Sequence, residues 1–197
     1  MRVIRRLSPA RSTISAIMLA LVMFAVAQAA QNGPSVKHHI KNFGCVNEKL
    51  YRGAQPQKCD YAELAAMGIK TVIDLQREGE ASEQKLVEAA GMKFYRIPMS
   101  DKDAPAPAQV EEFLKIVNDP ANQPVFIHCR GGRHRTGAMT AIYRMTHDGW
   151  SADQAFNEMK IYDFEHGFGH DALKQYVYSY FHQMEQRGVV VNSGTSK

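Results

Sequence analysis

Apolar positions along the chain follow two different periods, and segments with one period alternate with segments of the other. Short apolar or β-branched runs, which are typical of buried strands, occur at residues 50–51, 71–73, 94–99 and 125–128. Between and after these runs, apolar residues three and four apart indicate amphipathic helices. The predicted helices cover residues 60–68, 82–90, 107–118, 136–147, 151–160 and 171–186. This alternation predicts an α/β fold with a central, mostly parallel sheet flanked by helices.

Local chemistry marks where several of these helices begin. Asp60 and Glu63 stand in the first turn of the first helix, and Ser151 with Gln154 forms a capping box for a later one. Trp150, directly before that box, is expected to be a core residue at a helix start. The helix that begins at Pro107 carries four apolar residues on one face: Val110, Phe113, Leu114 and Val117.

The N-terminus has the layout of a bacterial secretory signal peptide. Arginines at positions 2, 5, 6 and 11 precede an uncharged apolar run over residues 13–27, and Ala27-Gln28-Ala29 is a cleavage-type site. We expect residues 1–29 to be removed and the protein to be periplasmic or secreted, with no membrane span after cleavage. The alternative is an uncleaved membrane anchor, for which an apolar run of about fifteen residues is short.

Charge and length become informative once the leader is set aside. The chain has 24 Lys and Arg against 20 Asp and Glu, and the leader holds four Arg and no acidic residue. The remainder is therefore balanced, which argues against a general nucleic-acid surface. Its length suits one domain with a real core. We expect a linker over residues 30–41, one domain over 42–187 and a flexible tail over 188–197.

The stretch HCRGGRHRTG, residues 128–137, carries the clearest chemical pattern in the chain. It follows the apolar run Val125–Ile127 and precedes a predicted helix, so it lies at a strand's carboxyl end, where ligands bind in such folds. Cys129 can act as a nucleophile only as a thiolate. The backbone amides from Arg130 onward, the Arg135 guanidinium and the positive end of the helix that follows would stabilise that anion. The same donors would hold a phosphoryl group.

The spacing within this loop matches what anion binding requires. Gly131 and Gly132 allow backbone angles at which successive N–H groups point inward. Arg135 then offers a planar fork that matches two phosphate oxygens. The Thr136 hydroxyl is placed to hydrogen-bond the sulfur and ease its departure, while Gly137 lets the helix pack close to the strand. The stretch lacks the Gly-Lys-Ser/Thr ending of a Walker nucleotide site.

With these residues the chain resembles the cysteine-dependent protein tyrosine phosphatase superfamily, whose signature is HCxxGxxR followed by Ser or Thr. The inner GRHRTG is most similar to plant and fungal atypical dual-specificity phosphatases, whose loop commonly reads Gly-Lys-His-Arg-Thr-Gly; Arg133 stands in place of that lysine. A looser likeness, shared with secreted bacterial members, runs from Leu50 to about Phe164 through YRGAQP, GIKTVIDL and FYRIPM. The resemblance implies a dual-specificity phosphatase-like fold and hydrolysis of phosphomonoesters through a phosphocysteine, with neither metal nor cofactor.

The resemblance also implies roles for other residues. A general acid is expected shortly after a strand, where Asp101 is the first choice and Asp103 the alternative. The other interpretation is that both are solvated acidic residues of a loop without a catalytic role. His128 is expected to support the loop through hydrogen bonds rather than to act as a base. The substrate would be a phosphorylated protein or lipid, or an inositol phosphate or pyrophosphate.

Several further residues have two interpretations each. Arg130 and Arg133 flank the mouth of the loop, either as binders of additional substrate phosphates or as a solvated rim. His134 either contacts a second phosphate or packs at that rim. Arg52 either reaches the anion site or, as we expect, forms a surface salt bridge. Four residues at 163–170 have a spacing that suits a metal, but we favour a glycine-spaced loop that shapes the pocket: Asp163, Glu165, His166 and His170.

The two cysteines outside the loop, Cys45 and Cys59, are predicted to form a disulfide in an oxidising periplasm. The alternatives are two unpaired thiols or a redox partner for Cys129, whose thiolate is vulnerable to oxidation. Two other functions compete with the phosphatase. A rhodanese-like sulfurtransferase also uses a cysteine on an anion-binding loop, although the Arg-Thr-Gly ending argues against it. The second is a non-catalytic phosphate-binding module.

Overall fold

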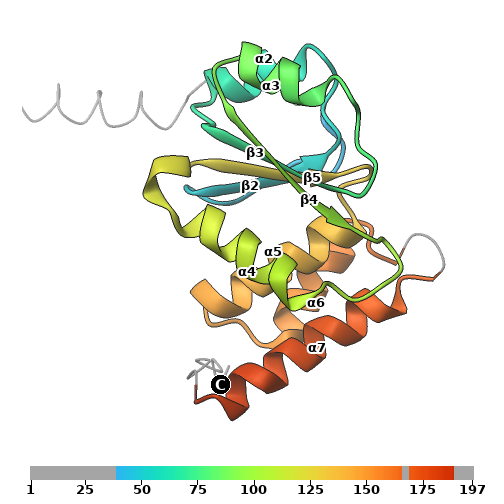
Figure 1. Ribbon diagram of the computed structural model, residues 1–197. Helices are drawn as coiled ribbons and strands as arrows, with labels where there is room; N and C mark the ends of the chain where they lie inside the picture. The colour runs from blue at the N-terminus through green and yellow to red at the C-terminus, as the bar shows by residue number, and fades with distance from the viewer. Residues whose placement is uncertain (1–38, 166–168, 189–197) are drawn as a thin grey trace, which may run out of the picture. The chain divides into compact units, whose positions relative to one another are not determined.

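The computed structural model describes residues 39–165 and 169–188, whose arrangement is shown in Figure 1. The predicted signal peptide lies outside these residues, as do most of the predicted linker and tail. Within the part of the chain that is described, no helix is long and apolar enough to cross a membrane.

Five strands form one sheet in the order β1-β2-β5-β3-β4. Their bounds are β1 Gly44–Asn47, β2 Leu50–Ala54, β3 Thr71–Gln76, β4 Lys93–Met99 and β5 Val125–Cys129. Strand β1 pairs antiparallel with β2, and all the other pairs are parallel. The predicted central, mostly parallel sheet is therefore confirmed. Strand β5 lies in its middle, so the loop that follows β5 is surrounded by the ends of neighbouring strands.

Helices cover both faces of the sheet, with α2 and α3 on one face and α4 to α7 on the other (Figure 1). Their bounds are α2 Asp60–Ala66, α3 Glu83–Ala89, α4 Pro107–Asn118, α5 His134–His147, α6 Ala152–Ile161 and α7 Asp171–Gln186, with a short 3-10 helix at Pro120–Asn122. The capping box is present, because the Ser151 hydroxyl accepts from the Gln154 amide at 3.2 Å. Trp150, just before it, is half-buried against the main core, as predicted.

Two apolar clusters fill the space between the sheet and these helices. Side chains of a strand alternate between its faces, and β5 divides its residues accordingly. Val125, Ile127 and Cys129 belong to the larger cluster under α4 to α7, whereas Phe126 belongs to the smaller cluster under α2 and α3. His128 follows Phe126 toward the α3 side. The alternation thus sends Cys129 and His128, adjacent in sequence, to opposite faces.

The domain begins earlier than the predicted boundary at residue 42. Ile40, which was assigned to the linker, is only 7% exposed and packs in the smaller cluster. The Lys41 carbonyl accepts from the Ala54 amide at 2.8 Å, so this segment is held against the end of β2. A single apolar residue in a polar stretch has no period, which is why the sequence pattern did not reveal it.

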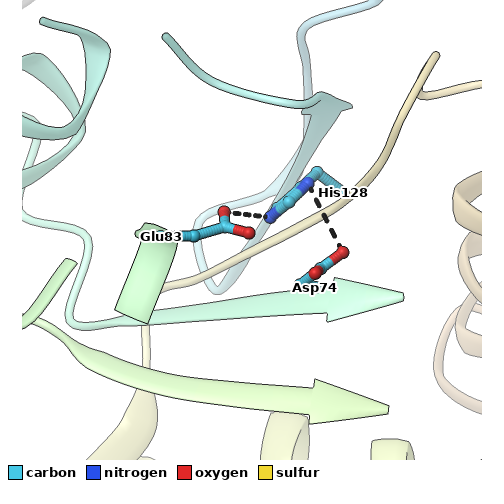
Figure 2. A group of neighbouring side chains, drawn as sticks. All are labelled: Asp74, Glu83 and His128. Atoms are coloured by element: carbon cyan, nitrogen blue, oxygen red, sulfur yellow. Dashed lines mark ion pairs between the residues drawn. The ribbon is translucent and has the colours of Figure 1, made fainter. Parts of the chain in front are cut away.

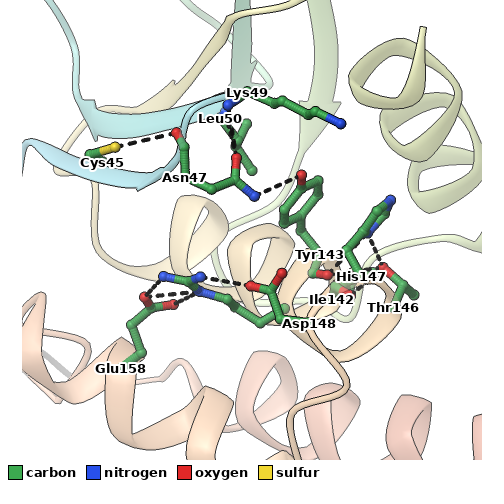
Figure 3. Close-up of polar contacts among 11 residues, drawn as sticks. Cys45, Asn47, Lys49, Leu50, Ile142, Tyr143, Thr146, His147, Asp148 and Glu158 are labelled. Carbon is green, nitrogen blue, oxygen red and sulfur yellow. Dashed lines mark hydrogen bonds and ion pairs between the residues drawn. The ribbon is translucent and has the colours of Figure 1, made fainter. Parts of the chain in front are cut away.

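The predicted disulfide between Cys45 and Cys59 is not formed, because both are free, exposed thiols. Cys45 lies on the edge strand β1, where its Sγ donates to the Asn47 carbonyl at 3.2 Å (Figure 3). Cys59 lies beyond the other end of the hairpin: it precedes α2, with its Sγ 3.7 Å from Asp60 Oδ1. The two thiols thus have different neighbours, one on the edge strand and one at the start of α2.

Candidate active site

The loop after β5 forms the floor and one wall of a pocket of about 370 Å³. Cys129 lies at the end of the strand and is 3% exposed, so its thiol faces the pocket from the bottom. The pocket brings together most of the residues singled out in the sequence and two that were not, Lys41 and Ala54; the rest of its lining is Asp101, Cys129, Arg130, Gly131, Arg133, His134, Arg135 and His170.

Only one of the two loop glycines needs to be glycine. Gly132 has a φ of +66°, in the left-handed region, and a Cβ there would lie 2.5 Å from the Gly53 carbonyl carbon. Gly131 differs: its φ is not positive, and a Cβ would meet the Arg133 side chain at an ordinary 3.7 Å. The expectation that both glycines are required is therefore corrected to Gly132 alone, because strand β2 passes directly behind it.

The expected role of Gly137 is also corrected. A Cβ at this position would meet Met159 of α6 at 3.4 Å, so the residue faces a neighbouring helix and not the strand. Helix α5 starts at His134, two residues earlier than predicted, which brings its positive end closer to the pocket. The Thr136 hydroxyl is buried and has no hydrogen-bond partner among the described residues. It is thus available to a sulfur or phosphoryl oxygen.

Arg135 connects the loop to the segment that carries the candidate acid. Its guanidinium lines the pocket, and Nη1 donates to the Met99 carbonyl at 3.4 Å. Met99 ends β4, two residues before Asp101. The Arg135 Nε is buried and has no hydrogen-bond partner among the described residues, so it remains available to a phosphoryl oxygen.

Of the two candidate acids, the structure brings only Asp101 to the pocket. Asp101 is half-buried and lines the cavity with Cys129. Its backbone is held by His170, whose Nδ1 donates to the Asp101 carbonyl at 2.6 Å. Asp103 is 75% exposed and faces Arg77 at 4.0 Å. The geometry therefore favours Asp101 as a proton donor and leaves Asp103 as a solvated loop acid.

His134 is packed at the rim of the pocket. Its ring stacks on His170 with 3.4 Å between centroids, and its Nε2 donates to the Phe164 carbonyl at 2.9 Å. Burial, with the neighbouring His170 ring, lowers the pKa of His134 to about 4, so the ring is neutral near pH 7. His134 was expected either to contact a second phosphate or to pack at the rim, and these contacts fit packing better. His166, of the suggested metal group, lies outside the described residues.

The cations at the mouth make few close polar contacts among the described residues. Arg130 is exposed, and Arg133 is half-buried with Nε 3.9 Å from the Asp163 carboxylate. Lys41 joins them from the N-terminal side of the domain. Cations at these positions can bind additional phosphate groups of a substrate. Their arrangement agrees with both interpretations of Arg130 and Arg133, as phosphate binders or as a solvated rim.

His128 is buried on the far side of the strand and supports the loop from behind. Its Nε2 lies 2.8 Å from Glu83 Oε1 and its Nδ1 lies 4.0 Å from Asp74 Oδ1 (Figure 2). Burial opposes ionisation of Glu83, but hydrogen bonds from His128, Tyr61 and Gln55 outweigh it and lower the pKa of Glu83. His128 is therefore held between two carboxylates, with no path to the pocket as a catalytic base.

Asp74, Glu83 and His128 have ligand atoms within 4.8 Å of one another, a spacing that also suits a metal ion. The protein already places a cation against both carboxylates. Arg96 Nε lies 2.9 Å from Asp74 Oδ2, and its Nη2 lies 4.0 Å from Glu83 Oε2. The Tyr61 hydroxyl donates to Glu83 at 2.9 Å. A guanidinium thus occupies the place of a cation, and the group is best described as a buried ion-pair network.

This network was missed in the sequence, although one residue pointed to it. Asp74 is a carboxylate inside the buried run of β3, and a charge in such a strand requires a partner. Nothing in the sequence around Glu83 and Arg96 indicates that they are the partners of Asp74. Arg52 was noticed but misassigned: it is fully buried, and its Nη2 donates to the Gly132 carbonyl at 2.7 Å, so it makes no surface salt bridge.

A mostly parallel α/β fold in which a buried cysteine and an arginine line one pocket at the carboxyl end of a strand is typical of the cysteine-dependent protein tyrosine phosphatase superfamily. A family model described as DSP-PTPase phosphatase fused to NAD+ kinase matches residues 24–175. The chain belongs to this family, in the atypical dual-specificity branch of the superfamily.

Two curated proteins are similar in sequence to this chain. The chain is 31% identical to yeast (Saccharomyces cerevisiae) inositol diphosphatase SIW14 over 130 residues, which are 63% of this chain and 46% of that protein. It is 32% identical to inositol diphosphatase DSP3 of Arabidopsis thaliana over 108 residues, 52% of this chain and 53% of that protein. The chain thus spans about half the length of these curated relatives.

A solved structure agrees with the computed fold. The core catalytic domain of the yeast PP-IP phosphatase SIW14, in complex with citrate, superposes with a TM-score of 0.63 at 25% identity. The match covers 76% of this chain and 94% of that one, so the catalytic core as a whole corresponds to the described domain.

Proposed function

We propose that this protein is a cysteine-dependent phosphatase in which Cys129 is the nucleophile. The observation that carries the proposal is the pocket itself, where the Cys129 thiol, the Arg135 guanidinium and the Asp101 carboxyl group meet. These residues come from two separate parts of the chain, the loop after β5 and the segment after β4. They converge on one cavity at the carboxyl edge of a mostly parallel sheet, which is the usual place for a ligand in such folds.

The reaction has two steps. The Cys129 thiolate attacks phosphorus, an S–P bond forms, and the P–O bond to the leaving group breaks while Asp101 gives its proton to the departing oxygen. In the second step Asp101 takes a proton from water, the water oxygen attacks phosphorus, and the P–S bond breaks to release inorganic phosphate. The thiolate and the protonated Asp101 are thereby both restored.

Electrostatic stabilisation supplies most of the acceleration. In both transition states negative charge spreads over the equatorial phosphoryl oxygens, which the loop amides and Arg135 are placed to bind. The Thr136 hydroxyl, buried and without a partner among the described residues, is assigned to the sulfur as it leaves. His128 holds the loop from behind, through Glu83 at 2.8 Å.

For the substrate we propose a compound with several phosphate groups, such as an inositol phosphate or pyrophosphate. Lys41, Arg130 and Arg133 surround the mouth of the pocket and can bind phosphates next to the one that reacts. The names of the yeast and Arabidopsis relatives, both inositol diphosphatases, support this choice. Phosphotyrosine and phospholipid headgroups are the competing substrates.

We also propose that the protein is exported to the periplasm or secreted. The support is the leader over residues 1–29, with its arginines, its apolar run and its Ala27-Gln28-Ala29 site. Mass spectrometry of the protein recovered from the periplasm would test this: a chain that begins at Ala30 supports export, and an intact Met1 contradicts cleavage.

Phosphate release from a substrate panel tests the enzymatic proposal. Purified protein is incubated with p-nitrophenyl phosphate, a phosphotyrosine peptide, inositol hexakisphosphate and an inositol pyrophosphate, beside a Cys129→Ser control. We expect turnover that the control lacks, highest on the pyrophosphate. Absence of turnover on every substrate would favour a phosphate-binding module, and persulfide formation with thiosulfate would favour the sulfurtransferase.

A further inference from the structure

Three successive carbonyl groups of the phosphate loop are each bound by a donor from one segment, residues 42–55. The Gln55 backbone N–H donates to the Arg130 carbonyl at 3.4 Å. The Asn42 side-chain amide donates to the Gly131 carbonyl at 2.8 Å, and Arg52 Nη2 donates to the Gly132 carbonyl at 2.7 Å. The two shorter bonds come from side chains, so they depend on residue type.

These bonds decide which way the loop amides point. A peptide unit is planar and trans, so its C=O and the N–H of the next residue point in opposite directions. A carbonyl held outward at Gly131 turns the Gly132 N–H inward, and one held at Gly132 turns the Arg133 N–H inward. The inward amides form the anion-binding nest on which the proposed phosphatase depends. The donors behind the loop therefore set its affinity for a phosphoryl group.

The Arg52 side chain is held by its position in β2, by its bond to the Gly132 carbonyl and by an aromatic ring. It is part of β2, fully buried, and its guanidinium stacks on the Tyr162 ring at 3.8 Å. Tyr162 fits there because Gly44, opposite Arg52 on β1, has no Cβ to meet the Tyr162 hydroxyl. Nothing needs to reorganise when a substrate binds, since the guanidinium already has its bonding geometry.

Arg52 also brings a positive charge that no carboxylate neutralises directly. Among the described residues it makes no ion pair, and its Nε and Nη1 are buried without a hydrogen-bond partner. Glu158, the acid with the largest electrostatic influence on Arg52, is engaged by Arg144 at 2.7 Å. Burial lowers the pKa of Arg52 to about 10, which leaves it charged near neutral pH. A buried, unpaired cation is costly for stability, and here it lies behind a loop built for anions.

Asn42 has an unusual backbone for its position. Its φ of +52° lies in the left-handed region, which asparagine tolerates better than most residues. This conformation aims the side-chain amide at the Gly131 carbonyl from outside the sheet. Residues held in this region cluster at functional sites, where the surroundings enforce them. Asn42 directly follows Lys41, whose side chain lines the pocket.

We propose that Asn42 and Arg52 are positioning residues for the phosphate loop. They hold the Gly131 and Gly132 carbonyls outward so that the following amides meet the phosphoryl oxygens, and Arg52 adds a fixed positive charge behind the loop. The inference deepens the proposed phosphatase function and rests on it. It assigns a role to two residues that do not touch the substrate.

Anion binding measured without catalysis tests this. Tungstate or inorganic phosphate protects Cys129 from alkylation by iodoacetamide when it occupies the loop, and the midpoint of protection gives its dissociation constant; mass spectrometry of the Cys129 peptide separates this thiol from the two exposed ones. The variants are Asn42→Asp, which replaces the donor by an acceptor, with Arg52→Met and Arg52→Lys. Asn157→Asp and Arg187→Met repeat the same chemical changes at exposed sites on α6 and beyond α7.

We expect tungstate to bind about tenfold more weakly to Asn42→Asp and Arg52→Met, and no more than about threefold more weakly to Arg52→Lys, which keeps the charge and a donor. On p-nitrophenyl phosphate, kcat should fall more than KM rises, because the amides bind the transition state more strongly than the substrate. A merely structural role would instead lower the melting temperature while leaving folded protein with unchanged affinity.

Two results separate failure of this inference from failure of the proposed function. If both anions protect the wild type and all three variants equally, Asn42 and Arg52 do not position the loop, whatever the enzyme does. If neither anion protects the wild type, the phosphatase proposal itself fails. Should Arg52→Met not fold, as judged by circular dichroism, Asn42→Asp and Arg52→Lys still decide the matter, since wild-type affinity in Asn42→Asp contradicts the proposal.

Discussion

Replacement of Asp101 by Asn should separate substrates by the pKa of their leaving groups. The change keeps the size of the side chain and removes its transferable proton. A tyrosine phenolate has a pKa near 10, so its departure gains from protonation, whereas a phosphate that leaves a pyrophosphate ionises near 6 and departs readily as an anion. The leaving groups thus differ by about four pKa units, and only the first depends strongly on an acid.

The structure sets the size of the effect. Positioned acids contribute about 10² to 10⁴ in rate. Asp101 is half-buried and its backbone is held by His170 at 2.6 Å, yet it lies on a loop at the edge of the cavity, so the lower end of that range applies. We expect kcat to fall about a hundredfold on a phosphotyrosine peptide and less than about threefold on an inositol pyrophosphate.

The assay is phosphate release at saturating substrate, compared between wild type, Asp101→Asn and Asp103→Asn. Asp103 is the matched control, because it is 75% exposed and faces Arg77 at 4.0 Å. Its replacement should change either rate by less than about twofold. Equal losses on both substrates in Asp101→Asn would refute the reasoning about leaving groups, and a larger loss in Asp103→Asn would refute the choice of acid.

Three further outcomes follow from the geometry. Gly132→Ala should abolish turnover, because of its φ of +66° and the 2.5 Å approach to strand β2, while Gly131→Ala should keep kcat/KM within about threefold. Glu83→Gln should lower the free energy of unfolding by about 3 kcal/mol at pH 7 in urea titrations. Because the pKa of Glu83 is lowered by folding, this stabilisation is present above the unfolded value near 4.3 and lost as pH falls through the folded one, so the two proteins should converge in acid. Thiol titration of the denatured, unreduced chain should count three thiols, since Cys45 and Cys59 are free; one thiol would indicate a disulfide.

Helices were predictable where periodicity and end chemistry agree. Helix α4 runs over Pro107–Asn118 as predicted, because a proline at the first position and a single apolar face define it. Helix α7 also has the predicted bounds. Strand β1 was missed, because its four residues include a glycine and its pairing with β2 is irregular between Cys45 and Asn47. A strand that short has too few positions for alternation to be recognised.

The loop after β5 was predictable because its chemistry is contiguous: the cysteine, the glycine and the arginine all lie within ten residues. The residues that contact the loop carbonyls lie far from it in sequence. Asn42 and Arg52 reach it from about eighty residues or more away in sequence, at 2.8 and 2.7 Å. Such contacts depend on sheet order, in which β5 lies between β2 and β3, and no local pattern encodes that order.

The alternation along β5 explains why the site needs residues on both faces of the sheet. Cys129 faces the pocket and His128 faces α3, so whatever fixes His128 also fixes the strand end that carries the Cys129 thiol. Asp74 on the adjacent strand β3 pairs in register with His128, and Glu83 closes the other side. The ion pairs behind the sheet and the carbonyl donors beside the loop therefore restrain the same short segment from two directions. A change on either side should displace the Cys129 sulfur without any contact with the substrate.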